Sequence, residues 1–168
     1  MAGSFEASAH LLGVVLSFLI GAAVSGAVLS ANSLKLGRHY DWLLVIEALL
    51  LFVSIYFLGD GLSFGHYTAS AACGLQNALA TTYSGAIVRT THVTGIVTDL
   101  GIMIGAWFRG KALDRRKSIL FLLIVSGFIL GGAAGASLYG VLGFMALSIP
   151  ASLCLVLALS YRVMVRGK

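Results

Sequence analysis

The polar side chains of this sequence concentrate in one stretch of an otherwise apolar chain, residues 74–101. Thr91, Thr94 and Thr98 recur three and four residues apart, so they share one face of a helix. Arg89 and Asp99 are ionisable groups within or beside an apolar run, where an unpaired charge costs about 3 kcal/mol. Such side chains, held away from water, can coordinate a polar solute or an ion. We therefore predict a solute-binding or ion-binding site formed by Gln76, Asn77, Arg89, Thr91, Thr94, Thr98 and Asp99.

The same residue types also have structural roles, and these alternatives stay open. Threonine, asparagine and glutamine commonly hydrogen-bond between membrane helices, and this is the first expectation for the threonines. Arg89 can instead reach the membrane surface and anchor a helix end. Glu47 either pairs with Arg38 or with the basic loop at residues 111–117, or carries a proton, and pairing is the first expectation.

Sequence signatures of catalysis and of cofactor binding are missing. The chain has no nucleophile elbow, P-loop, dinucleotide fingerprint or HExxH motif. Cys73 and Cys154 stand alone in apolar stretches, which favours neither a disulfide nor a zinc site. We therefore expect no enzyme, no cofactor and no metal. The basic residues form short clusters between apolar runs, so nucleic acid is not an expected partner either.

The composition predicts that lipid surrounds the chain. Of 168 residues, 59% are hydrophobic and only 10% are charged, whereas a soluble domain carries about 25% charged residues. Because backbone groups exposed to lipid must bond internally, each apolar run is expected to be helical. We predict an all-α polytopic transmembrane bundle that forms a single domain over residues 1–168, with apolar segments at 11–29, 42–59, 64–83, 87–108, 118–138 and 141–163.

The basic clusters predict how the segments cross the membrane. Lys and Arg residues follow the first and the fourth apolar runs and end the chain, so all three clusters are expected on the cytoplasmic side. Residues 64–108 must then make one net crossing, with a broken or re-entrant helix near Ser84 and Gly85. This favours five crossings, while six would leave a basic cluster outside. We expect a multi-pass protein of a bacterial inner membrane with a cytoplasmic C-terminus.

An internal repeat joins the two halves of the chain. Residues 18–28 align without gaps onto residues 128–138, and the predicted orientations of the two copies are opposite, as in inverted-repeat transporters. Both copies carry small residues four apart, a pattern that lets membrane helices approach closely and that chance can also produce. We predict helix packing, and homo-oligomers, through these faces, which are Ser17, Gly21 and Ser25 in one half and Gly127, Gly131 and Gly135 in the other.

Several short motifs resemble those of one bacterial family. Gly74-x-Gln-Asn77, Val88-Arg-Thr-Thr91, Thr94-Gly95 and Thr98-Asp-Leu-Gly101 are similar to the second-half signature of the YoaK-type membrane proteins, domain of unknown function 1275. The resemblance runs from Leu11 onward and implies about six spans and a membrane location, but no reaction. The family's N-terminal half-motif is absent. A symmetric two-part site, if the family uses one, is therefore expected to be incomplete. The offset of the internal repeat places the counterpart of residues 74–108 before residue 1, so we predict an incomplete inverted repeat that lacks its first segment, through natural truncation or a misplaced start codon.

These patterns together predict a membrane protein that binds or transports a small polar solute or ion at the broken-helix region, residues 74–101. The alternative is a structural or accessory membrane protein that acts through helix packing.

Overall fold

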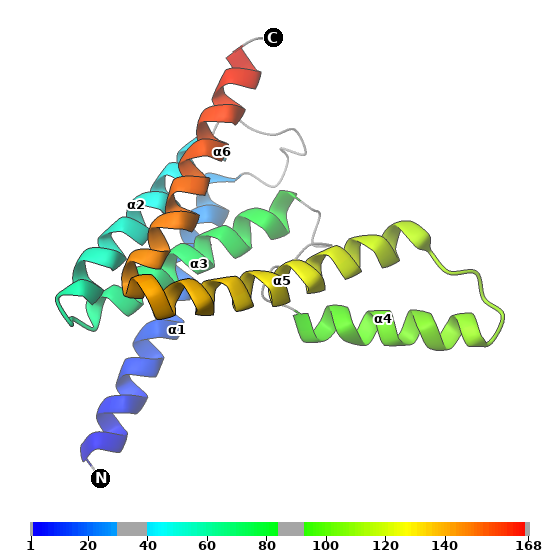
Figure 1. The fold of residues 1–168 in the computed structure, drawn as a ribbon, viewed down its shortest axis with the longest axis horizontal. Helices are drawn as coiled ribbons and strands as arrows, with labels where there is room; N and C mark the ends of the chain where they lie inside the picture. The colour runs from blue at the N-terminus through cyan, green and yellow to red at the C-terminus, as the bar shows by residue number, and fades with distance from the viewer. Residues whose placement is uncertain (1, 30–39, 84–92, 167–168) are drawn as a thin grey trace.

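The computed structural model describes residues 2–29, 40–83 and 93–166 of the chain (Figure 1). In these ranges the chain forms α1 (Ala2–Val28), α2 (Tyr40–Gly59), α3 (Phe64–Tyr83), α4 (Val93–Phe108), α5 (Arg115–Leu142), the 3₁₀ helix η1 (Gly143–Leu147) and α6 (Ser148–Arg166). The described ranges contain no strand. The predicted all-α fold is confirmed.

The helices follow the apolar runs of the sequence, with differences at their ends. The predicted run 64–83 coincides with α3, and the run 42–59 differs from α2 only at its start. Helix α1 begins well before the first apolar run, because polar residues there also bond within the helix, as the Ser8 hydroxyl does to the Ser4 carbonyl at 2.8 Å. Helix α4 begins at Val93, and the predicted break at Ser84 and Gly85 lies outside the described residues.

Three helical stretches are long and apolar enough to cross a membrane. They are Ser4–Val28, Tyr40–Gly59 and Arg115–Val165, the last of which contains both α5 and α6. Many large apolar side chains on these helices are exposed, among them Leu11, Leu130 and Val141. A protein surface of this kind is stable in lipid and not in water. The chain is therefore a membrane-embedded helical protein, while the number of crossings stays a prediction.

Helix α2 lies between α3 and α6 and contacts both of them (Figure 1). Helix α6 runs antiparallel to α2, because Asp41 near the start of α2 meets Arg162 near the end of α6. Helix α1 packs against α3 and runs parallel to it. The core between these helices is aliphatic and is formed by Leu29, Leu43, Leu44, Ala48, Leu75, Leu79, Cys154 and Ala158.

A tight turn reverses the chain between α2 and α3. Gly61 adopts φ of 72°, a conformation that favours glycine, and the amide of Leu62 bonds back to the carbonyl of Phe57 at 2.8 Å. The buried hydroxyl of Ser54 then donates to the carbonyl of Gly65 at 2.7 Å. These bonds hold the first turn of α3 against the last turns of α2.

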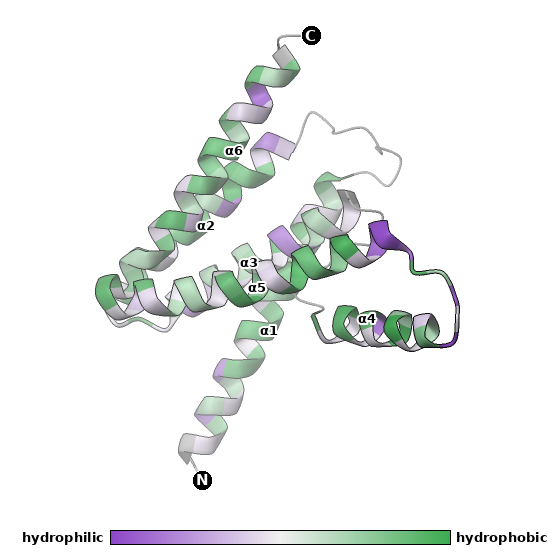
Figure 2. Ribbon diagram, turned by 45° about the vertical axis from the view of Figure 1, so that its right-hand side comes forward, coloured by the Kyte–Doolittle hydropathy of each residue, from purple (hydrophilic) through white to green (hydrophobic). Residues whose placement is uncertain are grey.

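Helices α4 and α5 form a hairpin that extends sideways from the other helices (Figure 1). Helix α4 packs mainly against α5, and α5 contacts η1. Gly110 adopts φ of 82° in the connecting loop, and the carboxylate of Asp114 caps α5 by accepting from the amide of Lys117 at 3.1 Å. Figure 2 shows the hydrophilic residues of this region gathered at the loop and the start of α5.

The turn between α5 and α6 is made by η1. Gly143 at the end of α5 adopts φ of 57°. Pro150 lies in the first turn of α6, where the missing amide hydrogen leaves no helical bond unmade. The hydroxyl of Ser148 donates to the carbonyl of Met145 at 2.7 Å. The proline therefore starts a new helix instead of bending a long one.

Candidate functional site

The carboxyl group of Glu47 is buried between helices with one oxygen unsatisfied. Glu47 lies on α2 and is only 5% exposed. Its Oε2 atom has no hydrogen-bond partner among the residues that the structure describes. The thiol of Cys154 on α6 hydrogen-bonds to the same carboxyl group. An unpartnered carboxylate oxygen in such surroundings is costly, so this group stands out as a candidate for binding.

The Glu47 carboxyl group lines a pocket between α2, α3 and α6. The pocket has a volume of about 210 Å³, and a water molecule takes about 30 Å³ in the liquid, so several waters or a small solute fit. The pocket exists because α3 and α6 both pack on α2 and diverge over it. Its lining consists of Tyr40, Leu44, Glu47, Gln76, Leu79, Ala80, Pro150, Leu153, Cys154 and Leu157.

The pocket extends from Tyr40 at the start of α2 to Pro150 near the start of α6. Tyr40, the first residue of α2, lies about 10 Å from Glu47 along the helix axis. One turn beyond Glu47, in the direction of η1, Leu51, Ala72 and Ala151 form a buried apolar layer. The polar end of the pocket is thus the end where α2 begins and α6 ends.

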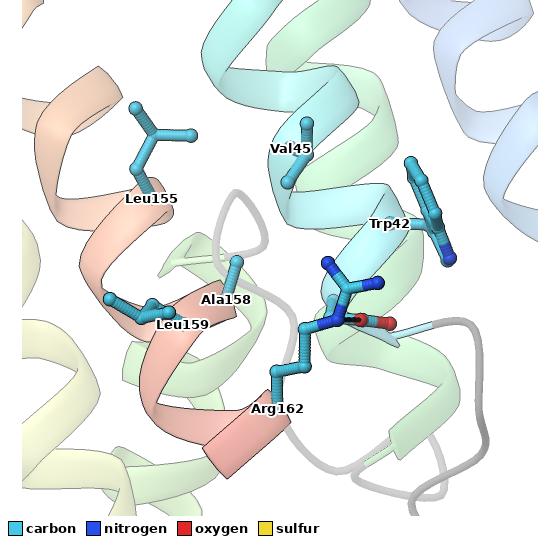
Figure 3. A pocket seen from close by; sticks show the side chains of 7 residues that line it. Trp42, Val45, Leu155, Ala158, Leu159 and Arg162 are labelled. Atoms are coloured by element: carbon cyan, nitrogen blue, oxygen red, sulfur yellow. Dashed lines mark ion pairs between the residues drawn. The ribbon is translucent and has the colours of Figure 1, made fainter.

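An ion pair joins α2 to α6 at this same end. The carboxylate of Asp41 lies 3.6 Å from Nε of Arg162, whose guanidinium group is 5.5 Å from the centre of the Trp42 ring. Figure 3 shows Arg162 extending from α6 toward Trp42, beside a hollow of about 140 Å³. The pair therefore already balances the charge of Asp41, and Glu47 does not share this partner.

The structure brings one predicted site residue to the Glu47 pocket. Gln76 lines the pocket from α3, as Glu47 does from α2 and Cys154 does from α6. Asn77, the next residue, is half-buried, and its backbone carbonyl accepts from the Thr81 hydroxyl at 2.7 Å. Among the predicted site residues on α3, Gln76 is the one that lines this pocket.

The other predicted site residues lie on α4 or outside the described part of the chain. Thr94, Thr98 and Asp99 are exposed on α4, and the Thr98 hydroxyl bonds to the Thr94 carbonyl of its own helix at 2.9 Å. Arg89 and Thr91 fall among residues that the structure does not describe. The contacts of α4 are mainly with α5, and Thr94, Thr98 and Asp99 do not line the pocket that contains Gln76.

The two predicted small-residue faces have different surroundings. A side chain at Gly21 would meet the backbone of Ala71 on α3, and one at Gly74 would meet the backbone of Phe18 on α1. Ser25 on the same face is fully buried. In contrast, a Cβ atom placed at Gly127, Gly131 or Gly135 meets nothing within 4 Å.

An open apolar groove lies beside this second face. It has a volume of about 540 Å³ and runs between α5, η1 and α6. Gly131 and Gly135 line it from α5, and Pro150 and Leu153 line it from α6. The face of α5 that the repeat singles out is therefore accessible.

Glu47 was not included in the predicted binding site. The first expectation for this residue was an ion pair, but Arg38 lies outside the described residues and no ion pair joins Glu47 to the described residues of the 111–117 loop. A glutamate inside an apolar run was the available signal. The position of that run against both α3 and α6 was needed to show that the carboxyl group is enclosed.

Comparison with known proteins identifies the family of the chain. No curated protein matches it, and no solved structure matches it either. Residues 1–160 match the family described as "Protein of unknown function (DUF1275)". Since this match covers nearly the whole sequence, the protein belongs to the DUF1275 family.

Proposed function

We propose that this protein binds and transports a small polar solute or ion across the membrane, with the pocket at Glu47 as its site. The observation that carries the proposal is the enclosed carboxyl group of Glu47, with one unpartnered oxygen, on the wall of a pocket of about 210 Å³. Ionisable groups buried in membrane helices are retained mostly for function, since they are costly there. The proposal involves binding and movement, without covalent chemistry or a cofactor.

An inverted repeat would suit this function, and the arrangement of two helices supports it. The offset that aligns residues 18–28 with 128–138 carries residues 40–58 of α2 onto residues 150–168, which overlap α6. Helices α2 and α6 are antiparallel neighbours. Corresponding helices of an inverted repeat are expected to have opposite directions, and transporter sites commonly lie between the repeats.

A flux assay with a panel of solutes tests the proposal even though the substrate is unidentified. Proteoliposomes are shrunk by osmotic shock with glycerol, urea, NaCl or KCl. Their reswelling, as the solute enters with water, is followed by light scattering. We expect faster reswelling than in protein-free liposomes for at least one of these solutes. Equal rates for all four would contradict transport.

Two variants decide where the site lies. Glu47→Gln removes the charge in the pocket, and Asp99→Asn does the same on α4, in the region that the sequence favoured. We expect Glu47→Gln to abolish the flux and Asp99→Asn to retain it. The opposite result would return the site to residues 74–101.

The orientation of the chain is also part of the proposal. We infer a bacterial inner-membrane location, with the α4–α5 loop and the C-terminus in the cytoplasm, from the positions of the basic residues. A cysteine at Asp60 should react with an impermeant reagent in intact cells, and one at Ala112 only after the membrane is opened, in a chain whose own cysteines are replaced by serine. Labelling at Ala112 from outside would favour six crossings.

A structural or accessory role is the second candidate function. The open face of α5, with Gly127, Gly131 and Gly135, favours it, because glycines that meet nothing in the monomer can contact a second copy of the chain. This role predicts dimers in the membrane. Cross-linking that yields only monomers would contradict it.

A further inference from the structure

The charge of the Glu47 pocket restricts what it can hold. Glu47 contributes the one carboxyl group among the residues that line the pocket, and the described lining contains no basic side chain. The nearest charged neighbours in the described helices, Asp41 and Arg162, are paired with each other and line a separate hollow. A negative site without a built-in counter-ion favours a cation over an anion or a neutral solute.

The ligands around the pocket favour a single positive charge. Divalent ions such as Ca²⁺ take six to eight oxygen ligands, commonly from more than one carboxylate. Glu47 has no second carboxylate in the pocket, and its other oxygen-bearing neighbours are the neutral Tyr40 and Gln76. No group of three His, Cys, Asp or Glu side chains that could hold a metal ion occurs in the described ranges.

The titratable groups of the described helices around Glu47 are the phenol of Tyr40, which lines the same pocket, and two thiols. Cys154 on α6 hydrogen-bonds to the Glu47 carboxyl group, and Cys73 lies on α3 within electrostatic range of it. On α2 itself, Asp41 is ion-paired with Arg162 near the mouth of the pocket. Within the described helices, none of these groups supplies a positive charge to Oε2.

We propose that the Glu47 pocket binds one monovalent cation, either a proton on the carboxyl group or an alkali-metal ion beside it, admitted from the end where α2 begins. The unpartnered Oε2 atom is the point of attachment, and Gln76 supplies a neutral amide oxygen. A buried apolar cluster of Leu51, Ala72 and Ala151 lies one turn beyond Glu47 in the direction of η1. This inference rests on the proposed site but does not require that transport occurs.

Proton release and infrared absorption distinguish the two forms of the cation. The full chain is placed in lipid nanodiscs in weakly buffered solution with a pH indicator, and NaCl, KCl or choline chloride is added. If an alkali-metal ion replaces the proton, NaCl or KCl releases up to one proton for each chain and choline chloride releases none. If the proton is the only occupant, no salt releases it, and the infrared spectrum shows a protonated carboxylic acid that alkali removes.

Matched variants assign these signals to Glu47. Glu47→Gln should abolish both signals, and Glu6→Gln, which changes an exposed carboxylate on α1, should retain them. Gln76→Leu should weaken binding of the alkali-metal ion by several-fold and leave the protonated acid unchanged, and it serves if Glu47→Gln does not fold. The proposal is overturned if neither signal differs between the wild-type chain and a folded Glu47→Gln variant.

The cation-binding measurement and the flux measurement test different claims, so either claim can be overturned without the other. A signal that depends on Glu47 without flux of any solute would retain the cation site and overturn transport. Flux with no signal that depends on Glu47 would retain transport and overturn the cation site.

Discussion

Helices α1 and α5 carry the same pattern of small residues but use it differently. On α1, Gly21 lies against the backbone of Ala71, and Gly74 of α3 lies against the backbone of Phe18. On α5, Gly131, which aligns with Gly21, meets no atom of another residue within 4 Å of where its Cβ would lie. One face is therefore an interior contact of the monomer, and the other is exposed.

The difference shows that a stripe of small residues makes a contact only where another helix covers it. Helix α3 offers Ala71 and Gly74 to α1, so the two backbones approach closely and van der Waals contact holds them together. The hairpin partner of α5 is α4, and their contact does not cover the glycine face of α5.

The largest effect is expected from leucine at the two aligned glycines. Gly21→Leu drives a side chain into the backbone of α3 and should cost roughly 3 kcal/mol or more of the free energy of unfolding, or prevent folding. Gly131→Leu enters open space and should change that free energy by less than about 0.5 kcal/mol. Unfolding followed by circular dichroism in mixed micelles measures both. Equal losses in the two variants would show that α5 is also covered.

The same Gly131→Leu variant also tests whether two copies of the chain contact each other through the exposed face of α5. If two copies of the chain meet through α5, the leucine should reduce the cross-linked dimer by at least about ten-fold, which corresponds to about 1.4 kcal/mol. The yield of dimer after cross-linking in native membranes measures this, with Gly26→Leu on an open position of α1 as the control. An unchanged yield would exclude the α5 face as the contact.

A smaller effect of opposite sign is expected at Ser25, on the covered face of α1. Its hydroxyl is fully buried and has no hydrogen-bond partner in the described part of the chain. Ser25→Ala removes the unsatisfied group and should raise the free energy of unfolding by about 1 kcal/mol. Ser54→Ala is the control, since it breaks a bond to the Gly65 carbonyl and should lower that free energy. A loss of stability in Ser25→Ala would mean that the hydroxyl is satisfied.

The smallest effect is expected from the one serine that bonds across the α1–α3 contact. The hydroxyl of Ser70 donates to the carbonyl of Val14 at 2.8 Å, whereas Ser137 on α5 donates to Ala133 of its own helix. Ser70→Ala should lower the free energy of unfolding by about 0.6 kcal/mol, and Ser137→Ala by less. The same unfolding assay compares them, and a larger loss in Ser137→Ala would reverse the assignment of the two faces.

Hydropathy predicted most helices, because an apolar segment in lipid must satisfy its backbone bonds internally. The run 64–83 coincides with α3. The last two runs, 118–138 and 141–163, were separated at residues 139–140, whereas α5 continues to Leu142 and α6 begins at Ser148 after η1. Hydropathy does not register a single backbone conformation such as that of Gly143, where α5 ends.

The predicted site residues stay a prediction, and the candidate pocket depends on contacts between helices that the sequence does not give. Gln76 was selected from its polar neighbours along the chain, and it does line the pocket. Glu47 lies 29 positions earlier in the sequence and was expected to be paired. The threonines of α4 matched a helical spacing, but spacing within one helix does not say which other helix faces it.

Composition and hydropathy by themselves determined that the protein is a helical membrane protein. An apolar segment in lipid forms a helix whichever helices lie beside it, because its backbone groups must bond within the segment. The tertiary structure alone decided that Gly21 is covered while Gly131 is open, and that Glu47 is enclosed with an oxygen unpartnered. These properties arise from contacts between helices that are distant in the sequence. The same residue pattern can therefore be buried in one half of the chain and exposed in the other.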